Sequence, residues 1–437
     1  MTFKSFYISI CIASECSDCL FISQGATERR TTMWVYPIIK CTDVACNLKC
    51  DYCFYRYMDQ SVRPGSVMSE EVLEKLVQDL LEVNRAKCEF LWHGGEPLLA
   101  GLGFFKKAIE FQGRYNRYGI VITNSIQTNG TLINEAFAEF FRQNGFRVGI
   151  SFDGPESIHD HHRKTVGGRS SFHSVLRGVK LCQEKRIPLS VVAVVTAHSV
   201  QFPEELYRFF LSQGIKSFSF NPAFEPDQKG QLCDFSVQDA EFADFMERIG
   251  KLWLEDDDPD VNIRQLSEPL KGMLGGELWA CIYSGQCSRF LDIYPNGDVK
   301  PCHSFLGESM RLGNILDAPL SEIIASETYE GFQRHVAQLP QDCLDCEHFT
   351  ICHGGCTDHR NVTVGGRHYE KYVYCGSRKR VFGLLETRLA ELGVPKKDLR
   401  RPADSDERKP EPRTGRVSEH KSEPELIQLT LLTKERR

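Results

Sequence analysis

Residues 46–55 read C-N-L-K-C-D-Y-C-F-Y and place three cysteines at C-x3-C-x2-C spacing, shortly after a short apolar segment at 34–39. Three closely spaced thiolates can ligate three irons of a [4Fe–4S] cluster. The fourth iron then lacks a protein ligand and is open to a substrate or cofactor. The alternative is zinc, but a structural zinc site prefers four protein ligands, commonly as two separated pairs. The spacing therefore favours an iron–sulfur cluster with one open iron.

Outward from this motif, apolar strands and amphipathic helices alternate as far as about residue 254. Ser69 can cap a helix whose apolar positions, from Val72 to Leu81, recur at helical spacing. Further helices are predicted at 104–111, 136–143, 174–182, 204–211 and, beyond this region, 381–392. Strands are predicted at 34–39, 89–92, 120–126, 148–152, 189–195 and 217–220. Repeated βα units predict a parallel sheet with helices outside, as a whole or partial barrel. Active residues should then lie at the C-terminal ends of the strands.

Three polar, glycine-containing motifs follow successive predicted strands. Gly94-Gly95-Glu96-Pro97 follows the second strand, Gln127-Thr128-Asn129-Gly130 the third, and S-F-D-G-P at 151–155 the fourth. Glycines allow close main-chain approach, and exposed carbonyls can accept an ammonium group. Each motif is weak evidence alone, since N-G is an ordinary turn. Their order after the cysteine motif makes the set specific.

In this order the motifs resemble those of radical SAM enzymes. The resemblance implies a partial (β/α)6 TIM-like barrel whose open iron binds S-adenosylmethionine (SAM). It implies cleavage of SAM to a 5′-deoxyadenosyl radical, which abstracts hydrogen from a substrate. The motif at 94–97 would receive the methionine amino group, Ser151 and Arg163 would contact the ribose and carboxylate regions, and Tyr52 would lie near the adenine. The cofactor-binding residues implied are Tyr52, Gly94, Gly95, Glu96, Asn129, Ser151 and Arg163.

Eight further cysteines lie between residues 281 and 375, in a region with little clear periodicity. Eight thiolates suffice for two fully ligated four-iron clusters. Zinc, or a single cluster with spare thiols, is the alternative. We expect this region to fold around metal rather than around a large apolar core.

The segments Y-P-N-G-D-V-K-P-C at 294–302, R-L-G-N-I at 311–315 and C-H-G-G-C at 352–356 extend the resemblance. They are similar to a cysteine-rich SPASM auxiliary-cluster domain, most closely that of anaerobic sulfatase-maturating enzymes. The resemblance implies interleaved ligands: Cys281, Cys287, Cys302 and Cys356 for the first auxiliary cluster, and Cys343, Cys346, Cys352 and Cys375 for the second. With Cys46, Cys50 and Cys53, three [4Fe–4S] clusters are expected. Fully ligated clusters have no open iron, so the auxiliary pair would carry electrons or stabilise the fold.

Members of that family oxidise a Cys or Ser of a sulfatase to formylglycine, and their base is an Asp directly after the third auxiliary cysteine. His303 occupies that position here. A histidine has a reference pKa near 6.5 and can act as a base, or it can simply pack beside the cluster. Tyr55 matches a family position near the substrate and either orients it or serves as a core aromatic.

Because His303 stands where the family has an Asp, a second hypothesis stays open. In it, the enzyme crosslinks or otherwise modifies a ribosomally made peptide. A third hypothesis is a non-catalytic iron–sulfur electron carrier, which the intact SAM motifs disfavour. The resemblance also implies a protein or peptide substrate and a flavodoxin or ferredoxin as electron donor. Exposed clusters imply a reducing, low-oxygen cytoplasm.

The charge balance and the length of the apolar runs argue against two other classes of protein, those that bind nucleic acid or anionic membranes and those that span a membrane. Basic residues number 53 and acidic residues 59, and the net charge of −6 gives no general affinity for nucleic acid or anionic membrane. The sequence has no apolar run of about 18 residues that could span a membrane. Four domains or segments are predicted: an extension at 1–32, a radical SAM core at 33–255, the SPASM domain at 256–395 and a charged tail at 396–437. We expect both terminal segments to be disordered.

Overall fold

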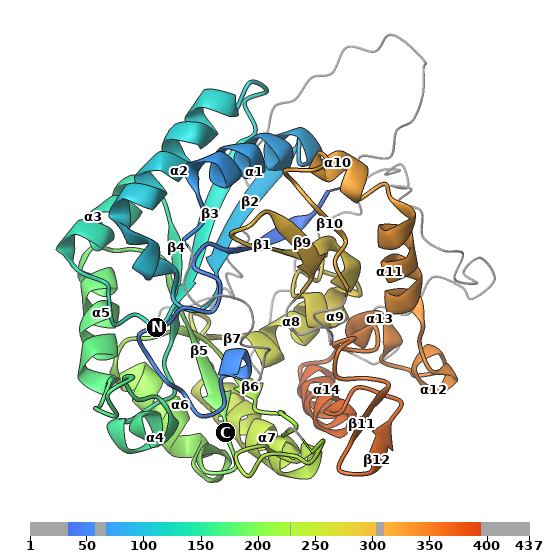
Figure 1. Ribbon diagram of the computed structural model, residues 1–437. Coiled ribbons are helices and arrows are strands. Elements are labelled where there is room, and N and C mark those ends of the chain that lie inside the picture. The colour runs from blue at the N-terminus through green and yellow to red at the C-terminus, as the bar shows by residue number, and fades with distance from the viewer. Residues whose placement is uncertain (1–33, 57–66, 228, 303–309, 395–437) are drawn as a thin grey trace, which may run out of the picture.

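The computed structural model describes residues 34–56, 67–227, 229–302 and 310–394 (Figure 1). The candidate base His303 and the predictions for 1–32 and 396–437 fall outside these ranges. The division at residue 255 stays a prediction.

A ten-stranded sheet forms the centre of the molecule, in the order β10-β9-β8-β1-β2-β3-β4-β5-β6-β7. The strands β1 to β7 run parallel and in sequence, which confirms the predicted βα succession as a partial barrel. The strands of this part are β1 (Tyr36–Lys40), β2 (Lys87–His93), β3 (Val121–Thr128), β4 (Arg147–Ser151), β5 (Leu189–Val195), β6 (Ser217–Pro222) and β7 (Asn262–Ile263).

Helices line the outside of this part of the sheet (Figure 1). Ser69 caps the first of them, because its side chain accepts a hydrogen bond from the Val72 amide. The helices are α1 (Glu70–Val83), α2 (Gly101–Tyr115), α3 (Glu135–Gln143), α4 (Glu156–His162), α5 (Phe172–Glu184), α6 (Pro203–Ser212) and α7 (Asp239–Asp256). The short 3-10 turns η1 (Phe54–Arg56), η2 (Pro97–Ala100) and η3 (Ser199–Gln201) follow β1, β2 and β5.

The second half of the chain extends the same sheet. Strand β8 (Phe290–Ile293) pairs in parallel with β1, and β9 (Asp298–Pro301) and β10 (Gly313–Asn314) continue antiparallel. The hairpin β11 (Val362–Val364) and β12 (Arg367–Tyr369) is separate. The remaining elements are α8 (Arg264–Met273), α9 (Cys281–Ser284), η4 (Cys287–Arg289), α10 (Leu320–Ile323), α11 (Glu327–Ala337), α12 (Gln341–Leu344), α13 (Phe349–Cys352) and α14 (Cys375–Glu391).

This second half has more apolar core than the sequence suggested. Side chains such as Leu320, Phe332, Phe382 and Leu385 are buried and belong to the same continuous core as the barrel. The expectation that this region lacks a large apolar core was therefore wrong. Of the residues named, Leu320 lies in the four-residue helix α10, which is too short to show a helical periodicity in the sequence.

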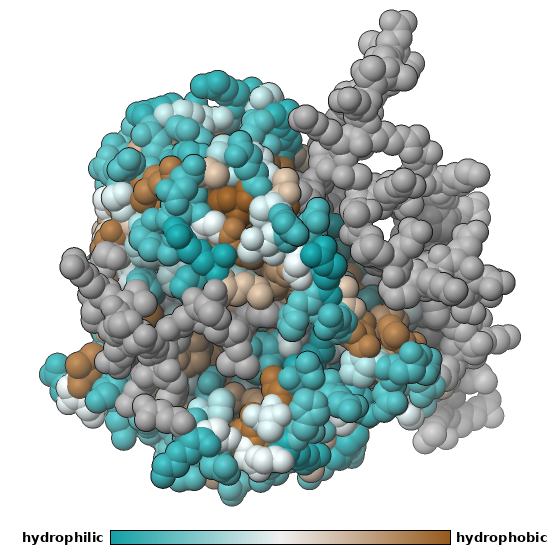
Figure 2. All heavy atoms as spheres, turned by 45° about the vertical axis from the view of Figure 1, so that its right-hand side comes forward, coloured by the Kyte–Doolittle hydropathy of each residue, from teal (hydrophilic) through white to brown (hydrophobic). Residues whose placement is uncertain are grey.

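The face shown in Figure 2 is mainly hydrophilic, with hydrophobic residues in small separate groups. Within the described ranges, no helix combines the length and apolar character needed to cross a membrane.

Candidate active site

Cys46, Cys50 and Cys53 lie in the loop that follows β1, at the C-terminal ends of the parallel strands. Leu48, Tyr52 and Ala223 are buried with Cys50, while Cys46 and Cys53 pack against them. The loop is also tied to the segment after α4, because the Lys49 amide donates to the Lys164 carbonyl at 2.7 Å. The predicted C-x3-C-x2-C motif thus forms one packed loop over the strand ends.

The thiols in this loop are largely withdrawn from water. Burial raises the pKa of Cys46 to about 11 and that of Cys50 to about 12. The Leu48 amide donates to Cys46 Sγ at 3.4 Å, and amide donors of this kind stabilise cluster thiolates. Iron binding needs thiolates, so metal would displace the protons that burial holds on these groups.

The motif at 94–97 supports the cysteine loop through its main chain. The amides of Gly95 and Glu96 donate to the carbonyls of Asp43 and Ala45, both at 2.7 Å. A Cβ on Gly95 would lie 2.1 Å from the Ala45 carbonyl oxygen, and Gly94 has a φ of +118°. Both glycines are therefore required by the close approach of two backbone segments.

Glu96 joins this motif to the end of β3. Its fully buried carboxylate accepts hydrogen bonds from Thr128 Oγ1 at 2.6 Å, the Asn129 amide at 2.7 Å and the Leu98 amide at 3.0 Å. Burial raises the pKa of Glu96 to about 7, although these three hydrogen bonds act to lower it. Asn129 Nδ2 in turn donates to Asn47 Oδ1 at 2.8 Å and lies 3.7 Å from Cys46 Sγ. Glu96 and Asn129 therefore position the cysteine loop.

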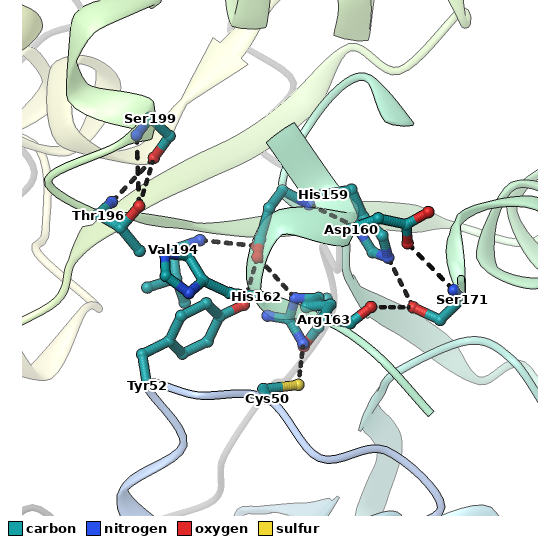
Figure 3. A network of polar contacts seen from close by, with 12 residues as sticks. Cys50, Tyr52, His159, Asp160, His162, Arg163, Ser171, Val194, Thr196 and Ser199 are labelled. Carbon is teal, nitrogen blue, oxygen red and sulfur yellow. Dashed lines mark hydrogen bonds and ion pairs between the residues drawn. The ribbon is translucent and has the colours of Figure 1, made fainter. Parts of the chain in front are cut away.

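A buried polar network joins β4, α4 and the cysteine loop (Figure 3). The Asp153 carboxylate accepts from Arg163 Nε at 2.8 Å, from the Val194 amide at 3.0 Å, and from the Tyr52 hydroxyl in a short hydrogen bond. Arg163 Nη1 also approaches Cys50 Sγ at 3.9 Å. The network brings Tyr52 and Arg163, both predicted cofactor contacts, together beside Cys50, a predicted cluster ligand.

A second layer holds this network in place. His159 accepts a hydrogen bond from the Asp153 amide at 3.3 Å and contacts Ser171 Oγ at 2.9 Å. Ser171 Oγ donates to the Arg163 carbonyl at 2.7 Å. Burial lowers the pKa of His159 to about 4, so this ring is neutral near pH 7. Ser151, the other predicted SAM contact here, accepts from Gln127 Nε2 at 3.0 Å.

The later cysteines gather in two places. Burial raises the pKa of Cys281 and Cys356, and charge repulsion within the group Cys281, Cys287 and Cys356 adds to it. The same two causes raise the pKa of Cys343 and Cys375, through repulsion among Cys343, Cys346, Cys352 and Cys375. The first neighbourhood contains three of the four ligands predicted for the first auxiliary cluster, and the second contains all four predicted for the second. Arg360 lies near members of both groups.

Tyr55 and Cys302 lie where the two halves of the chain meet. Lys40 Nζ, at the end of β1, donates to the Tyr55 hydroxyl at 2.6 Å and pairs with Asp292 Oδ2 of β8 at 3.3 Å. The Lys40 and Asp292 side chains have no exposed surface. Burial raises the pKa of Tyr55 well above its usual value, and Asp292, Tyr294, Cys53 and Cys302 add to the shift. Tyr55 therefore sits near cysteines of two different sets.

Three buried charged residues of the site were not predicted from the sequence: Lys40, Asp292 and Asp153. Asp153 stands inside the quoted motif S-F-D-G-P, so its position after a strand was an available signal. Lys40 and Asp292 are separated by 252 positions of sequence, and only the pairing of β1 with β8 brings them together. His303 lies outside the described residues.

The three groups of cysteine thiols fit iron–sulfur clusters. Each thiolate of a [4Fe–4S] cluster binds a different iron, so a cluster does not require three ligands converging on one ion. Consistently, the described residues contain no group of three His, Cys, Asp or Glu side chains arranged for a single metal ion. A three-thiol loop at the strand ends of a partial barrel, with two further thiol groups beyond it, defines a radical SAM enzyme with an auxiliary-cluster domain.

Comparison with known proteins narrows this class. Residues 43–210 match the radical SAM superfamily, and residues 281–347 match the SPASM iron–sulfur cluster-binding domain. A cysteine-type anaerobic sulfatase-maturating enzyme of Clostridium perfringens is 33% identical over 81% of this chain and 97% of the relative. A serine-type enzyme of Bacteroides thetaiotaomicron is 33% identical over 75% of this chain and 83% of the relative.

A solved structure, native anSMEcpe with bound AdoMet and the Cp18Cys peptide, superposes with a TM-score of 0.74. It is 32% identical and covers 81% of this chain and 98% of the solved one. The present chain belongs to the family of anaerobic sulfatase-maturating enzymes. It is a radical SAM oxidoreductase whose cofactors are S-adenosylmethionine and [4Fe–4S] clusters, three in number.

Proposed function

We propose that this enzyme oxidises a Cys or Ser side chain of a sulfatase to formylglycine. The observation that carries the proposal is the 33% identity to maturases of both the cysteine and the serine type, over most of their lengths. When bound, SAM and its cluster supply the radical that removes a hydrogen atom from the substrate, and the auxiliary clusters supply an acceptor for the departing electron.

The proposed ligands of the SAM cluster are Cys46, Cys50 and Cys53. The auxiliary ligands are those given above, Cys281, Cys287, Cys302 and Cys356 for the first cluster and Cys343, Cys346, Cys352 and Cys375 for the second. The grouping of the buried thiols supports both assignments. The SAM contacts proposed are Tyr52, Gly94, Gly95, Glu96, Asn129, Ser151 and Arg163. Glu96 and Asn129 also hold the cysteine loop in position, so we expect them to affect SAM binding indirectly as well.

Tyr55 is proposed to orient the substrate side chain. Lys40 fixes its hydroxyl oxygen at 2.6 Å, and its neighbours include both Cys53 and Cys302. A substrate oxidised between the SAM cluster and the first auxiliary cluster would have to enter this region. Flavodoxin or ferredoxin is proposed as the reductant.

His303 is proposed to accept the thiol or hydroxyl proton of the substrate after hydrogen abstraction. Its position directly after Cys302 supports this role. We expect His303→Leu to lower formylglycine formation by about 10²-fold or more, while SAM cleavage continues. His303→Asp should restore part of the product. Equal product yields from His303→Leu and the unchanged enzyme would exclude the role.

The proposed function is tested by incubating the reconstituted, reduced enzyme and SAM with sulfatase-type peptides that carry either Cys or Ser. Mass spectrometry should detect formylglycine in at least one peptide. The Cys46→Ala, Cys50→Ala, Cys53→Ala variant is the control and should leave both peptides unchanged. Cleavage of SAM with both peptides unchanged would contradict sulfatase maturation and favour another peptide substrate.

A further inference from the structure

Arg378, on α14, is a buried cation in contact with a cysteine of the second auxiliary group. Its Nη1 donates to Cys352 Sγ at 3.3 Å and to the Ile282 carbonyl at 2.8 Å. The residue is 6% exposed. This hydrogen bond to sulfur is shorter than the one that Arg163 Nη1 donates to Cys50 Sγ at 3.9 Å.

Two tyrosine rings flank the Arg378 guanidinium. It lies over the rings of Tyr283 and Tyr372, 4.4 and 4.5 Å from their centroids. No Asp or Glu in the described part of the chain forms an ion pair with it. An unpaired buried charge is very unfavourable, so a nearby anion is required.

The Cys352 sulfur, which becomes a thiolate when it ligates iron, is the anion that the geometry provides. In addition, Arg378 Nη2 is buried and donates no hydrogen bond to any described residue. This second donor is available for an acceptor that a cluster on Cys352 would supply.

We propose that Arg378 is the counter-ion of the second auxiliary cluster and holds its reduction potential at a higher value. One-electron reduction adds one negative charge to a cluster, and a fixed positive charge in a dry environment stabilises that reduced state. The cluster thereby becomes a better electron acceptor. This inference rests on the proposed assignment of Cys352 as a ligand.

The test uses the full-length, reconstituted enzyme without peptide, poised at graded potentials and followed by EPR spectroscopy. The signal of the SAM cluster is identified by its change when SAM is added, and the remaining signals belong to the auxiliary clusters. Iron is quantified in every sample. The variants are Arg378→Gln, which removes the charge but keeps a donor, and Arg378→Lys, which keeps the charge. Arg380→Gln, on the same helix and exposed beside Asp244 and Glu247, is the matched control.

We expect Arg378→Gln to shift the midpoint potential of one auxiliary cluster to a more negative value. The midpoint potential of Arg378→Lys should lie between those of Arg378→Gln and the unchanged enzyme. Arg380→Gln should have no effect. Unchanged midpoints at full iron content, or equal shifts in the Gln and Lys variants, would overturn the proposal. If Arg378→Gln retains only about two-thirds of the iron, retention of all iron by Arg378→Lys supports the counter-ion role, and equal loss in both overturns it. Full iron content in Cys352→Ala would instead contradict the ligand assignment.

Discussion

Gly95 shows how a single missing side chain permits the active-site loop to form. An added Cβ would lie 2.1 Å from the Ala45 carbonyl oxygen, which is backbone and cannot move alone. We expect Gly95→Ala to lower the free energy of unfolding by roughly 1–3 kcal/mol and to reduce iron incorporation at the SAM cluster. Gly103→Ala, in α2 with no atom within 4 Å of the new Cβ, should be neutral or stabilising. Denaturant unfolding and iron analysis measure both, and equal behaviour of the two variants would contradict the packing argument.

Glu96 should make stability depend on pH. Its pKa is raised from 4.5 in the unfolded chain to about 7 in the folded one, mainly by burial. Between these values the folded state holds a proton that the unfolded state has released, so stability falls as pH rises through the window and levels off above it. The slope should be roughly 1.4 kcal/mol per pH unit and should be missing in Glu96→Gln. Parallel stability profiles of the two proteins would show that Glu96 does not titrate in this range.

The sequence revealed the residues of the site that stand in ordered motifs, but not those that act through tertiary contacts. Cys46, Gly95 and Arg163 could be chosen from spacing and resemblance. Asp153 was inside a quoted motif, yet its role as acceptor for Tyr52 and Arg163 depends on where α4 brings Arg163. The same limit applies to Arg378, because its contact with Cys352 is made across two helices.

At the scale of elements, the start of α14 depends on a carboxylate from another helix. Asp239, the first residue of α7, accepts hydrogen bonds from the amides of Gly376 and Ser377 at 2.9 and 2.8 Å. These are N-terminal amides of α14, whose first residue is Cys375. A helix N-terminus favours such an acceptor.

We therefore expect Asp239→Ala to destabilise the protein by roughly 1–2 kcal/mol and to lower iron content through displacement of Cys375. Asp244→Ala removes an exposed carboxylate from the same helix α7 and should have little effect on either quantity. Thermal unfolding and iron analysis of the two variants provide the comparison. A fully stable, iron-replete Asp239→Ala protein would refute the capping role.

Several helices and strands with regular patterns were predicted, but α7 (Asp239–Asp256), the longest helix of the described residues, was not. The predicted helix at 136–143 corresponds to α3 (Glu135–Gln143), since three phenylalanines mark one face. The predicted helix at 381–392 corresponds to α14, which begins six residues earlier, at Cys375. Its first turn carries few apolar residues and is fixed by Asp239 instead, so its periodicity could not show the start.

At the scale of the whole molecule, a buried ion pair joins the two halves of the chain. Lys40 of β1 and Asp292 of β8 both have fully buried side chains, and the strands pair in parallel. Asp292→Leu would leave the Lys40 ammonium buried without its carboxylate, and we expect a loss of roughly 3–5 kcal/mol in stability. The double variant Lys40→Met, Asp292→Leu should recover much of that loss, because both charges are removed. Denaturant unfolding of both variants tests the pair, and a single variant as stable as the unchanged protein would contradict it.

The most direct test of the central claim follows one hydrogen atom. A sulfatase-type peptide deuterated at the β-carbon of its target Cys or Ser is incubated with reduced enzyme and SAM, and 5′-deoxyadenosine is analysed by mass spectrometry. A radical enzyme that oxidises this side chain should transfer deuterium into 5′-deoxyadenosine while formylglycine appears in the peptide, and the Cys46→Ala, Cys50→Ala, Cys53→Ala variant should give neither. Unlabelled 5′-deoxyadenosine from the intact enzyme, with the deuterium retained in the peptide, would contradict the account.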